Sequence, residues 1–467
     1  MNNETVSFVT RTGNKYIYDN NSGQIFCEMG ARKREQISEF KKKIGQYKKQ
    51  PIEIITESQV NDFLMKNGYK QLQLEVTTGC NLRCKYCCFS ECYEYTRSHG
   101  SDFMSWDVAQ KAIDEYYSNF KIVKQNNPTR NACVSFYGGE PLLNFKLIKS
   151  VTEYIAKKYP MFQTDYNITT NATLLDEKIG DFLVKNNFAV LISLDGDKET
   201  QDRNRVFANG GGTFDVVMKN LKAFRKKHPG YPKLAISACY DPTIDFEKIE
   251  QFFNEEKLLV AKHAFIDGTN TTYFDRFTPT DWENFQKNQR KFRDKYILAA
   301  KPFSKDEFIS YSVGVGYMEF AFHIMYGDKR NSITPYTGTC VPGEKMYVAT
   351  DGTVHMCEKV NPRYSIGNVN SGGLDAKKIA DIANEYNREI ATHCQNCEIS
   401  KVCSLCFKAF GGADGFVYDE NICNNLKDHV RETLVEYAEL LEKRPQEVER
   451  ITGEYFGKVM EAIGEGC

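Results

Sequence analysis

The sequence lacks any long apolar run. Its 467 residues contain no stretch that approaches the roughly 20 apolar residues of a membrane-spanning helix. The first residues, Met1 to Glu4, lack the basic-then-apolar order of a secretory signal peptide. An excess of charge is also missing, since the formal net charge of -1 gives no general attraction to nucleic acid or anionic membranes. We therefore expect a cytoplasmic protein with no nucleic-acid partner and no membrane partner.

Cysteine, by contrast, is abundant and unevenly placed. Five of the 16 cysteines lie between Cys80 and Cys92, and seven lie between Cys340 and Cys423. Such residues could form disulfides in a secreted chain, but in a reducing cytoplasm clustered cysteines indicate metal or redox chemistry. The isolated residues at positions 27, 133 and 239 are interpreted as small buried apolar side chains.

The chain is too long for one ordinary core, so two or three domains are expected. Residues 6–10, 15–18 and 24–27 have the pattern of short strands separated by turn-forming segments, and polar helical stretches follow at 34–49 and 57–67. So small a module buries little surface, and we expect it to depend on a neighbouring domain or a ligand.

From residue 71 onward, short apolar runs alternate with amphipathic helices. Strands are expected at 72–76, 133–137, 166–170, 189–194, 234–239 and 264–266, with helices between them such as 105–120, 146–158, 176–185 and 214–227. This order predicts an α/β fold in which six βαβ units form a partial barrel with a parallel sheet. Active sites of such sheets lie at the carboxyl ends of the strands. Residues 340–423 are turn-rich, as expected of a domain organised by metal.

The first motif follows the first barrel strand directly. Cys80, Cys84 and Cys87 form a C-x3-C-x2-C loop. Three thiolates on so short a loop can bind three irons of a cubane cluster and leave a fourth iron for another ligand. A structural zinc ion is the alternative, and its fourth ligand would have to come from Cys88, Cys92 or elsewhere.

This loop, with Tyr86 just before its third cysteine, resembles that of the radical S-adenosylmethionine (SAM) superfamily. The resemblance implies that Cys80, Cys84 and Cys87 are catalytic ligands of a [4Fe–4S] cluster whose open iron binds SAM. Reductive cleavage of SAM would give a 5′-deoxyadenosyl radical that takes a hydrogen atom from the substrate. The electron would come from an external donor of flavodoxin or ferredoxin type.

A second motif, Gly138-Gly139-Glu140-Pro141, ends the second barrel strand. Paired glycines let the backbone approach a ligand, and a carboxylate beside them can accept hydrogen bonds from an ammonium group. The motif resembles the GGEP sequence with which the family grips the SAM amino group.

Three further polar residues stand at or after later strand ends. The resemblance implies that Ser193 and Arg205 bind the SAM carboxylate and that Asn171 lines the same pocket. Relatives often carry histidine where Gln201 stands, so Gln201 receives no role.

The later cysteines could fold around zinc, and their pattern alone leaves zinc and iron–sulfur both open. Their arrangement resembles the SPASM domain of peptide-modifying radical SAM enzymes, although two residues rather than three separate Cys403 from Cys406. The resemblance implies two auxiliary [4Fe–4S] clusters, and hence three clusters in all. The outer one would be bound by Cys394, Cys397, Cys403 and Cys423. The inner one would be bound by Cys340, Cys357 and Cys406, and would keep an open iron because the nearest preceding cysteine is Cys239.

The resemblance also implies a peptide substrate and five segments. Residues 1–67 would recognise a leader peptide by strand addition, 68–300 form the barrel, 301–335 linker helices, 336–430 the SPASM domain and 431–467 terminal helices. We expect thioether formation in a cysteine-containing precursor peptide, with the cysteine sulfur held at the inner cluster. Sulfatase maturation to formylglycine, carbon–carbon cross-linking and epimerisation are alternatives. An electron-transfer protein without a substrate would need neither the barrel nor the strand-end motifs.

Overall fold

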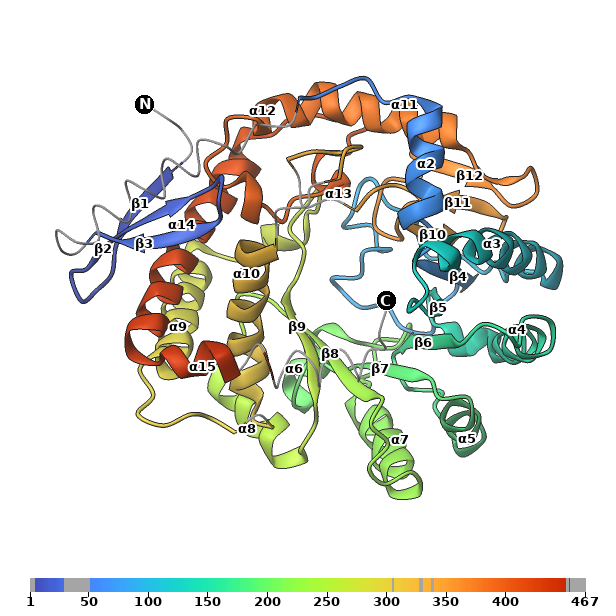
Figure 1. Ribbon diagram of the computed structural model, residues 1–467. Helices are drawn as coiled ribbons and strands as arrows, with labels where there is room; N and C mark the ends of the chain where they lie inside the picture. Colours follow the sequence, from blue (N-terminus) through green and yellow to red (C-terminus); the bar gives the residue numbers. More distant parts are fainter. Residues whose placement is uncertain are drawn as a thin grey trace.

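The computed structural model describes residues 5–28, 51–304, 306–326, 331–336, 340–450 and 453, without the side chains of 322–326. The helix expected at 34–49 lies outside these residues. Ten strands form one sheet in the order β13-β12-β11-β10-β4-β5-β6-β7-β8-β9, and β1 to β3 form a separate antiparallel sheet (Figure 1). No helix in the described ranges is long and apolar enough to cross a membrane.

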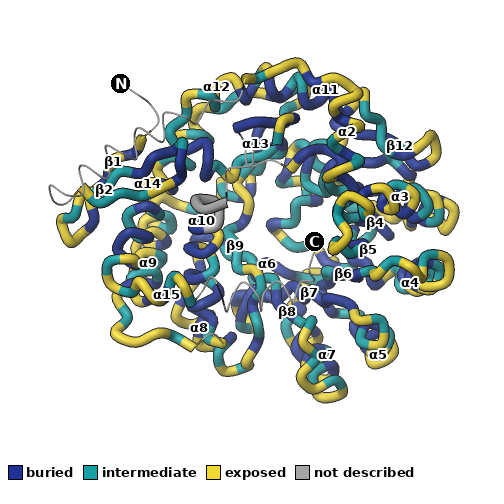
Figure 2. The backbone as a smooth tube through the Cα atoms, viewed as in Figure 1, coloured by how far each residue is buried: buried dark blue, intermediate teal, exposed yellow. Residues whose placement is uncertain are grey.

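Six parallel strands make up the partial barrel. They are β4 (Gln71–Thr77), β5 (Ala132–Gly138), β6 (Thr164–Thr170), β7 (Ala189–Ser193), β8 (Leu234–Tyr240) and β9 (Val260–Phe265). The helices between them are α3 (Trp106–Asn126), α4 (Phe145–Lys158), α5 (Glu177–Lys185), α6 (Lys198–Asn204), α7 (Phe214–Lys227) and α8 (Phe246–Glu256). Helices α3, α4, α5 and α7 line the outside of the sheet, with buried faces inward and exposed faces outward (Figures 1 and 2). The predicted partial barrel is confirmed.

The last barrel strand differs from its prediction. It spans 260–265 rather than 264–266, because Lys262 and His263 interrupt the apolar run from which a strand is predicted. Lys262 lies in register with Ser237 of β8. Both side chains line the cavity inside the barrel, where water can solvate polar groups. Sequence patterning also missed α6 and α8, which begin at the capping aspartates Asp197 and Asp245.

The cysteine-rich C-terminal domain continues the barrel sheet. Strand β10 (Lys345–Val348) pairs in parallel with β4, and β11 (Thr353–His355), β12 (Ser365–Asn368) and β13 (Gly373–Leu374) follow in antiparallel order. The segment is turn-rich, as expected, but it also contains these four strands, which are too short for an alternating pattern to identify. Strand β10 covers the edge of β4 that would otherwise be free. Helix α11 (Ala376–Tyr386) follows them.

The N-terminal residues contact two different parts of the molecule. Strands β1 (Thr5–Val9), β2 (Lys15–Asp19) and β3 (Gln24–Cys27) form the expected small sheet, which packs on α14 (Glu420–Lys443). Arg11 donates from its backbone N to Glu439 Oε1 at 2.7 Å, and Tyr16 donates its hydroxyl to Glu442 at 2.8 Å. Helix α2 (Glu57–Asn67) instead packs between α3 and α11 (Figure 1).

The remaining helices are α9 (Pro279–Ile297), α10 (Val315–Tyr326), α12 (Thr392–Cys394), α13 (Phe407–Phe410) and, after α14, α15 (Pro445–Arg450). Short π-helical segments lie at Ser310–Gly314 and Asn387–Ala391, and 3-10 turns at Pro141–Asn144, Tyr273–Arg276 and Ser400–Val402. Residues 275–335 are thus largely helical where they are described, as expected.

Candidate active site

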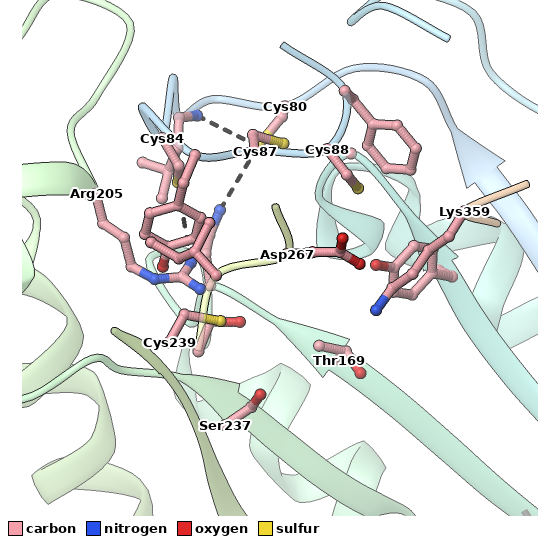
Figure 3. A pocket seen from close by; sticks show the side chains of 18 of the residues that line it. Cys80, Cys84, Cys87, Cys88, Thr169, Arg205, Ser237, Cys239, Asp267 and Lys359 are labelled. Carbon is pink, nitrogen blue, oxygen red and sulfur yellow. Dashed lines mark hydrogen bonds between the residues drawn. The ribbon is translucent and has the colours of Figure 1, made fainter. Parts of the chain in front are cut away.

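A cavity of about 460 Å³ lies at the carboxyl ends of the six parallel strands (Figure 3). The loop after β4, the ends of β5 to β9 and the C-terminal domain all contribute to its wall. The predicted residues that line it are Cys80, Cys84, Tyr86, Cys87, Gly138, Gly139, Glu140, Asn171, Ser193 and Arg205. The structure therefore brings every predicted barrel-site residue to one cavity.

The cysteine loop is tied to the segment after α6. Arg83 N donates to the Val206 carbonyl at 2.8 Å, and Lys85 N donates to the Asn204 carbonyl at 3.0 Å. Burial raises the pKa of Cys80 to about 12, and it also raises the pKa of Cys84. Without a metal these thiols are protonated near neutral pH, and metal binding must displace their protons.

Polar groups are already directed at the loop sulfurs. Leu82 N lies 3.4 Å from Cys80 Sγ, Asn171 Nδ2 lies 3.9 Å from the same sulfur, and Arg205 donates toward Cys84 Sγ at 3.9 Å. Donors of this kind stabilise thiolate ligands and tune the potential of an iron–sulfur cluster. The donor set therefore fits the cluster implied by the sequence.

The paired glycines allow two loops to pack backbone against backbone. Gly139 N donates to the Thr77 carbonyl at 3.0 Å, and Glu140 N donates to the Gly79 carbonyl at 2.9 Å. A Cβ at Gly139 would lie 2.0 Å from the Gly79 carbonyl oxygen, a distance too short for any side-chain carbon. In the structure the glycines admit the start of the cysteine loop, and because both also line the cavity, the expected approach of a ligand to them stays a prediction.

Glu140 binds protein groups with both carboxylate oxygens. Oε1 accepts from Thr170 Oγ1 at 2.6 Å and from Leu142 N at 3.1 Å, and Oε2 accepts from Asn171 N at 2.7 Å. The carboxylate thus fastens the end of β5 to the end of β6. These protein hydrogen bonds account for the burial of the Glu140 carboxylate without the expected contact with an ammonium group.

This arrangement makes stability depend on pH. Burial raises the pKa of Glu140 to about 7 against these hydrogen bonds. The native state then binds the proton more tightly than the unfolded chain, so stability is greatest below the unfolded pKa and falls as pH rises toward 7. We expect about 3 kcal/mol of this dependence to vanish in Glu140→Gln. Urea unfolding of both proteins between pH 4.5 and 7.5 measures the difference, and equal pH dependences would contradict it.

Asp195 holds the opposite wall together, and sequence reasoning assigned it no role. It accepts from Arg205 Nε at 3.1 Å, from Cys239 N at 3.0 Å and from the Tyr86 hydroxyl. This buried pairing fixes the guanidinium of Arg205 beside the cavity. In the sequence, the only signal for this role of Asp195 was its position two residues after Ser193, at the end of a predicted strand.

The isolated cysteines differ from their interpretation in two cases. Cys133 is fully buried in β5, as expected, whereas Cys27 in β3 is only half-buried. Cys239, however, lines the cavity at the end of β8 (Figure 3). Cys239 is distinguished from the other isolated cysteines by its position at the carboxyl end of a barrel strand, not by its residue type.

The later cysteines separate into two groups. Lys345 interacts electrostatically with Cys340 and Cys357, and Cys340 in turn interacts with Cys406. In the other group Tyr418 interacts with both Cys394 and Cys423, and Cys423 interacts with Cys397. Cys403 follows the 3-10 turn at 400–402. The assignment of these cysteines to two ligand sets remains a prediction.

No three histidine, cysteine, aspartate or glutamate side chains in the described ranges are placed to share one metal ion.

The fold and the site together define a barrel enzyme in which a cysteine loop follows the carboxyl end of the first barrel strand. Residues 74–255 match the family model of the Radical SAM superfamily. This part of the chain is a radical SAM domain.

Relatives extend the likeness beyond the barrel. The chain is 26% identical over 342 residues to the cysteine-type anaerobic sulfatase-maturating enzyme of Clostridium novyi, covering 70% of this chain and 84% of that one. It is 24% identical over 379 residues to the radical SAM cyclopropyl synthase TigE of Paramaledivibacter caminithermalis, covering 78% and 73%. The solved structure of anSMEcpe with bound AdoMet superimposes with a TM-score of 0.56 at 20% identity, covering 84% and 97%. This last likeness supports the fold.

Proposed function

We propose that the protein is a peptide maturase that forms thioether cross-links in a cysteine-containing precursor peptide. The observation that carries the proposal is the composition of the cavity wall. Lys359 and Lys408 of the C-terminal domain line the same cavity as Cys80, Cys84 and Cys87. A substrate in this cavity would therefore contact the barrel and the second cysteine-rich domain together.

The residues of the barrel fit SAM and a [4Fe–4S] cluster. Cys80, Cys84 and Cys87 would hold the cluster, Arg205 and Ser193 would hold the SAM carboxylate, and Asn171 would line that pocket. Bound together, these cofactors would supply a 5′-deoxyadenosyl radical that abstracts hydrogen from the substrate. The chain itself orients Arg205 through Asp195, keeps the cysteine loop against β5 and excludes bulk water from the cavity.

The C-terminal cysteines would hold two further clusters. Cys394, Cys397, Cys403 and Cys423 would form the outer ligand set, and Cys340, Cys357 and Cys406 the inner one. Cys239, the nearest cysteine before Cys340 in the sequence, lies on β8 beside Asp195. The inner set would thus keep a ligand position for the substrate cysteine.

Two relatives support a peptide as the substrate class. The sulfatase-maturating enzymes mature sulfatases, as their names state, and one solved anSMEcpe structure contains a Cp18Cys peptide. The sheet β1 to β3 would bind the leader by strand addition, and a flavodoxin or ferredoxin would supply the electron. Sulfatase maturation is the second candidate, because this chain covers 84% of the Clostridium novyi enzyme.

The deciding experiment uses a short cysteine-containing peptide encoded beside this chain. Anaerobic incubation with the enzyme, SAM and dithionite should release 5′-deoxyadenosine and remove two hydrogen atoms from the peptide. The cross-linked cysteine should resist alkylation by iodoacetamide. An aldehyde that reacts with a hydrazide probe would instead indicate formylglycine, and an absence of 5′-deoxyadenosine would contradict the enzyme assignment.

The inner cysteine set makes a separate prediction. Cys406→Ala should lose cross-linked product by about a hundredfold or more, because the substrate sulfur loses its proposed site, while 5′-deoxyadenosine is still released. Product by mass spectrometry and 5′-deoxyadenosine by chromatography measure the two steps. Cys27→Ala, in the distant β3, is the matched control. Product formation by Cys406→Ala at the wild-type rate would exclude the inner set from the reaction.

A further inference from the structure

The turn between β2 and β3 is buried, although it consists of polar, turn-forming residues. Asp19, Asn20 and Ser22 all lie among the buried residues, and Asn20 is only 7% exposed. Turns normally lie at the surface, because a buried turn carries polar groups that water cannot reach. Asp19 and Ser22 bond to each other, since Ser22 Oγ donates to Asp19 Oδ2 at 2.6 Å. The side chain of Asn20 is directed instead at the C-terminal domain.

Asn20 bonds to the segment that lies between two of the later cysteines. Its Nδ2 donates to the Cys397 carbonyl at 3.2 Å and to Ser400 Oγ at 3.0 Å. Its Oδ1 accepts from Lys401 N at 2.9 Å. An amide side chain suits this position, because it offers donors and an acceptor to one stretch of backbone. A single residue of the N-terminal sheet thus contacts three positions of the segment 397–401.

The 3-10 turn at Ser400–Val402 gains stability from such outside partners. So short a turn has poor internal hydrogen-bond geometry, and its first N–H groups lack acceptors within it. Asn20 supplies the acceptor for Lys401 N, and apolar packing adds to the attachment. The turn, the N-terminal sheet and α14 share one buried apolar cluster, which contains Val6, Phe8, Tyr18, Ile399, Val402, Val430, Leu434 and Ala438 (Figure 1).

Two cysteines of the proposed outer ligand set, Cys397 and Cys403, flank this turn. Cys397 N donates to the Cys394 carbonyl at 3.1 Å, which places a third cysteine of the set beside them. Cys397 also lines one cavity together with Asn424, the residue that follows Cys423. The fold therefore gathers the outer cysteines around the segment that Asn20 holds, and several thiols near one another suit an iron–sulfur cluster.

We propose that Asn20 is a positioning residue for the outer ligand set. By holding residues 397–401 in place, it fixes how Cys397 and Cys403 are presented to a cluster. The N-terminal sheet is then a part of the outer cluster site, in addition to its proposed role in leader binding. The inference rests on the proposed function, in which these cysteines hold a cluster, and it adds a residue from the opposite end of the chain to that site.

Asn20→Ala in the full-length, cluster-loaded enzyme tests the proposal. With a chelator present, about four irons per chain should leave at least about tenfold faster than from the wild type, whereas the remaining irons should leave at the wild-type rate. Hydrogen exchange gives a readout that does not depend on iron. The amide of Lys401 should exchange about tenfold faster in the variant, because it loses its acceptor.

Asn14→Ala is the matched control, because it removes the same side chain from the other turn of the sheet. Asn14 Nδ2 donates to Glu442 Oε1 at 2.9 Å, near the end of α14 that is remote from Cys423. Iron release and exchange at Lys401 should therefore stay at their wild-type rates. Equal acceleration in both variants would indicate a general weakening of the N-terminal sheet and would overturn a specific role for Asn20.

Wild-type rates of iron release and of exchange in Asn20→Ala would also overturn the proposal. A wild-type enzyme that holds iron for the loop cluster alone would reject the outer set itself, and with it both this inference and that part of the proposed function. These measurements need no peptide and no turnover. Failure to form a thioether would thus reject the proposed reaction and leave the role of Asn20 standing.

Discussion

Replacing Cys84 by alanine is expected to reduce the release of 5′-deoxyadenosine by more than about a thousandfold. Cys84 is one of four loop cysteines that line the cavity, together with Cys80, Cys87 and Cys88. Its sulfur lies beside Arg205, which is itself paired with Asp195. Chromatography of anaerobic reactions with SAM and dithionite measures the effect.

Cys92→Ala is the matched control for this experiment. Cys92 belongs to the same cysteine-rich stretch, but it does not line the cavity, and its sulfur contacts the Lys85 carbonyl at 3.8 Å. We expect it to retain activity within about twofold. Iron analysis adds a second readout, because Cys84→Ala should lose about four irons per chain and Cys92→Ala none. Loss of activity in both variants would mean that the loop, rather than a cluster ligand, had been disrupted.

Gly139→Ala should have the second largest effect, although it removes no polar group. The new Cβ would lie 2.0 Å from the Gly79 carbonyl oxygen and 3.0 Å from Cys80 N. Both neighbours are backbone, so relief requires the cysteine loop to move away from β5. We expect at least about 3 kcal/mol of destabilisation and loss of the loop cluster. Iron content and thermal unfolding measure these effects.

Gly316→Ala tests whether steric conflict, rather than loss of glycine as such, is responsible. Gly316 lies in α10, and a Cβ there would meet nothing within 4 Å. Alanine should therefore stabilise the helix by about 0.5–1 kcal/mol and leave iron content unchanged. If Gly139→Ala bound iron as well as Gly316→Ala does, the backbone contact with Gly79 would not be what positions the loop.

The sequence by itself determined the features that depend on local spacing. Only three residues separate Cys80 from Cys84, and only two separate Cys84 from Cys87. A single loop therefore holds the three thiols, whatever the rest of the chain does. Alternation of apolar runs and helices was likewise sufficient for the first five barrel strands, because each buries its own side chains between a helix and its neighbours. Most of the last strand was not predicted, because Lys262 and His263 interrupt its apolar run. The strand tolerates such residues because polar groups can be solvated in the interior of the barrel.

Tertiary structure alone decided the partners of the buried polar groups. Glu140 meets Thr170 and Asn171 only because β5 and β6 are adjacent, and Asp195 reaches Tyr86 only because the cysteine loop crosses the end of β7. The pairing of β10 with β4 joins residues more than 270 positions apart and brings Lys359 to the cavity. No local pattern specifies such contacts, since a buried polar group takes whichever partner the packed chain places within reach.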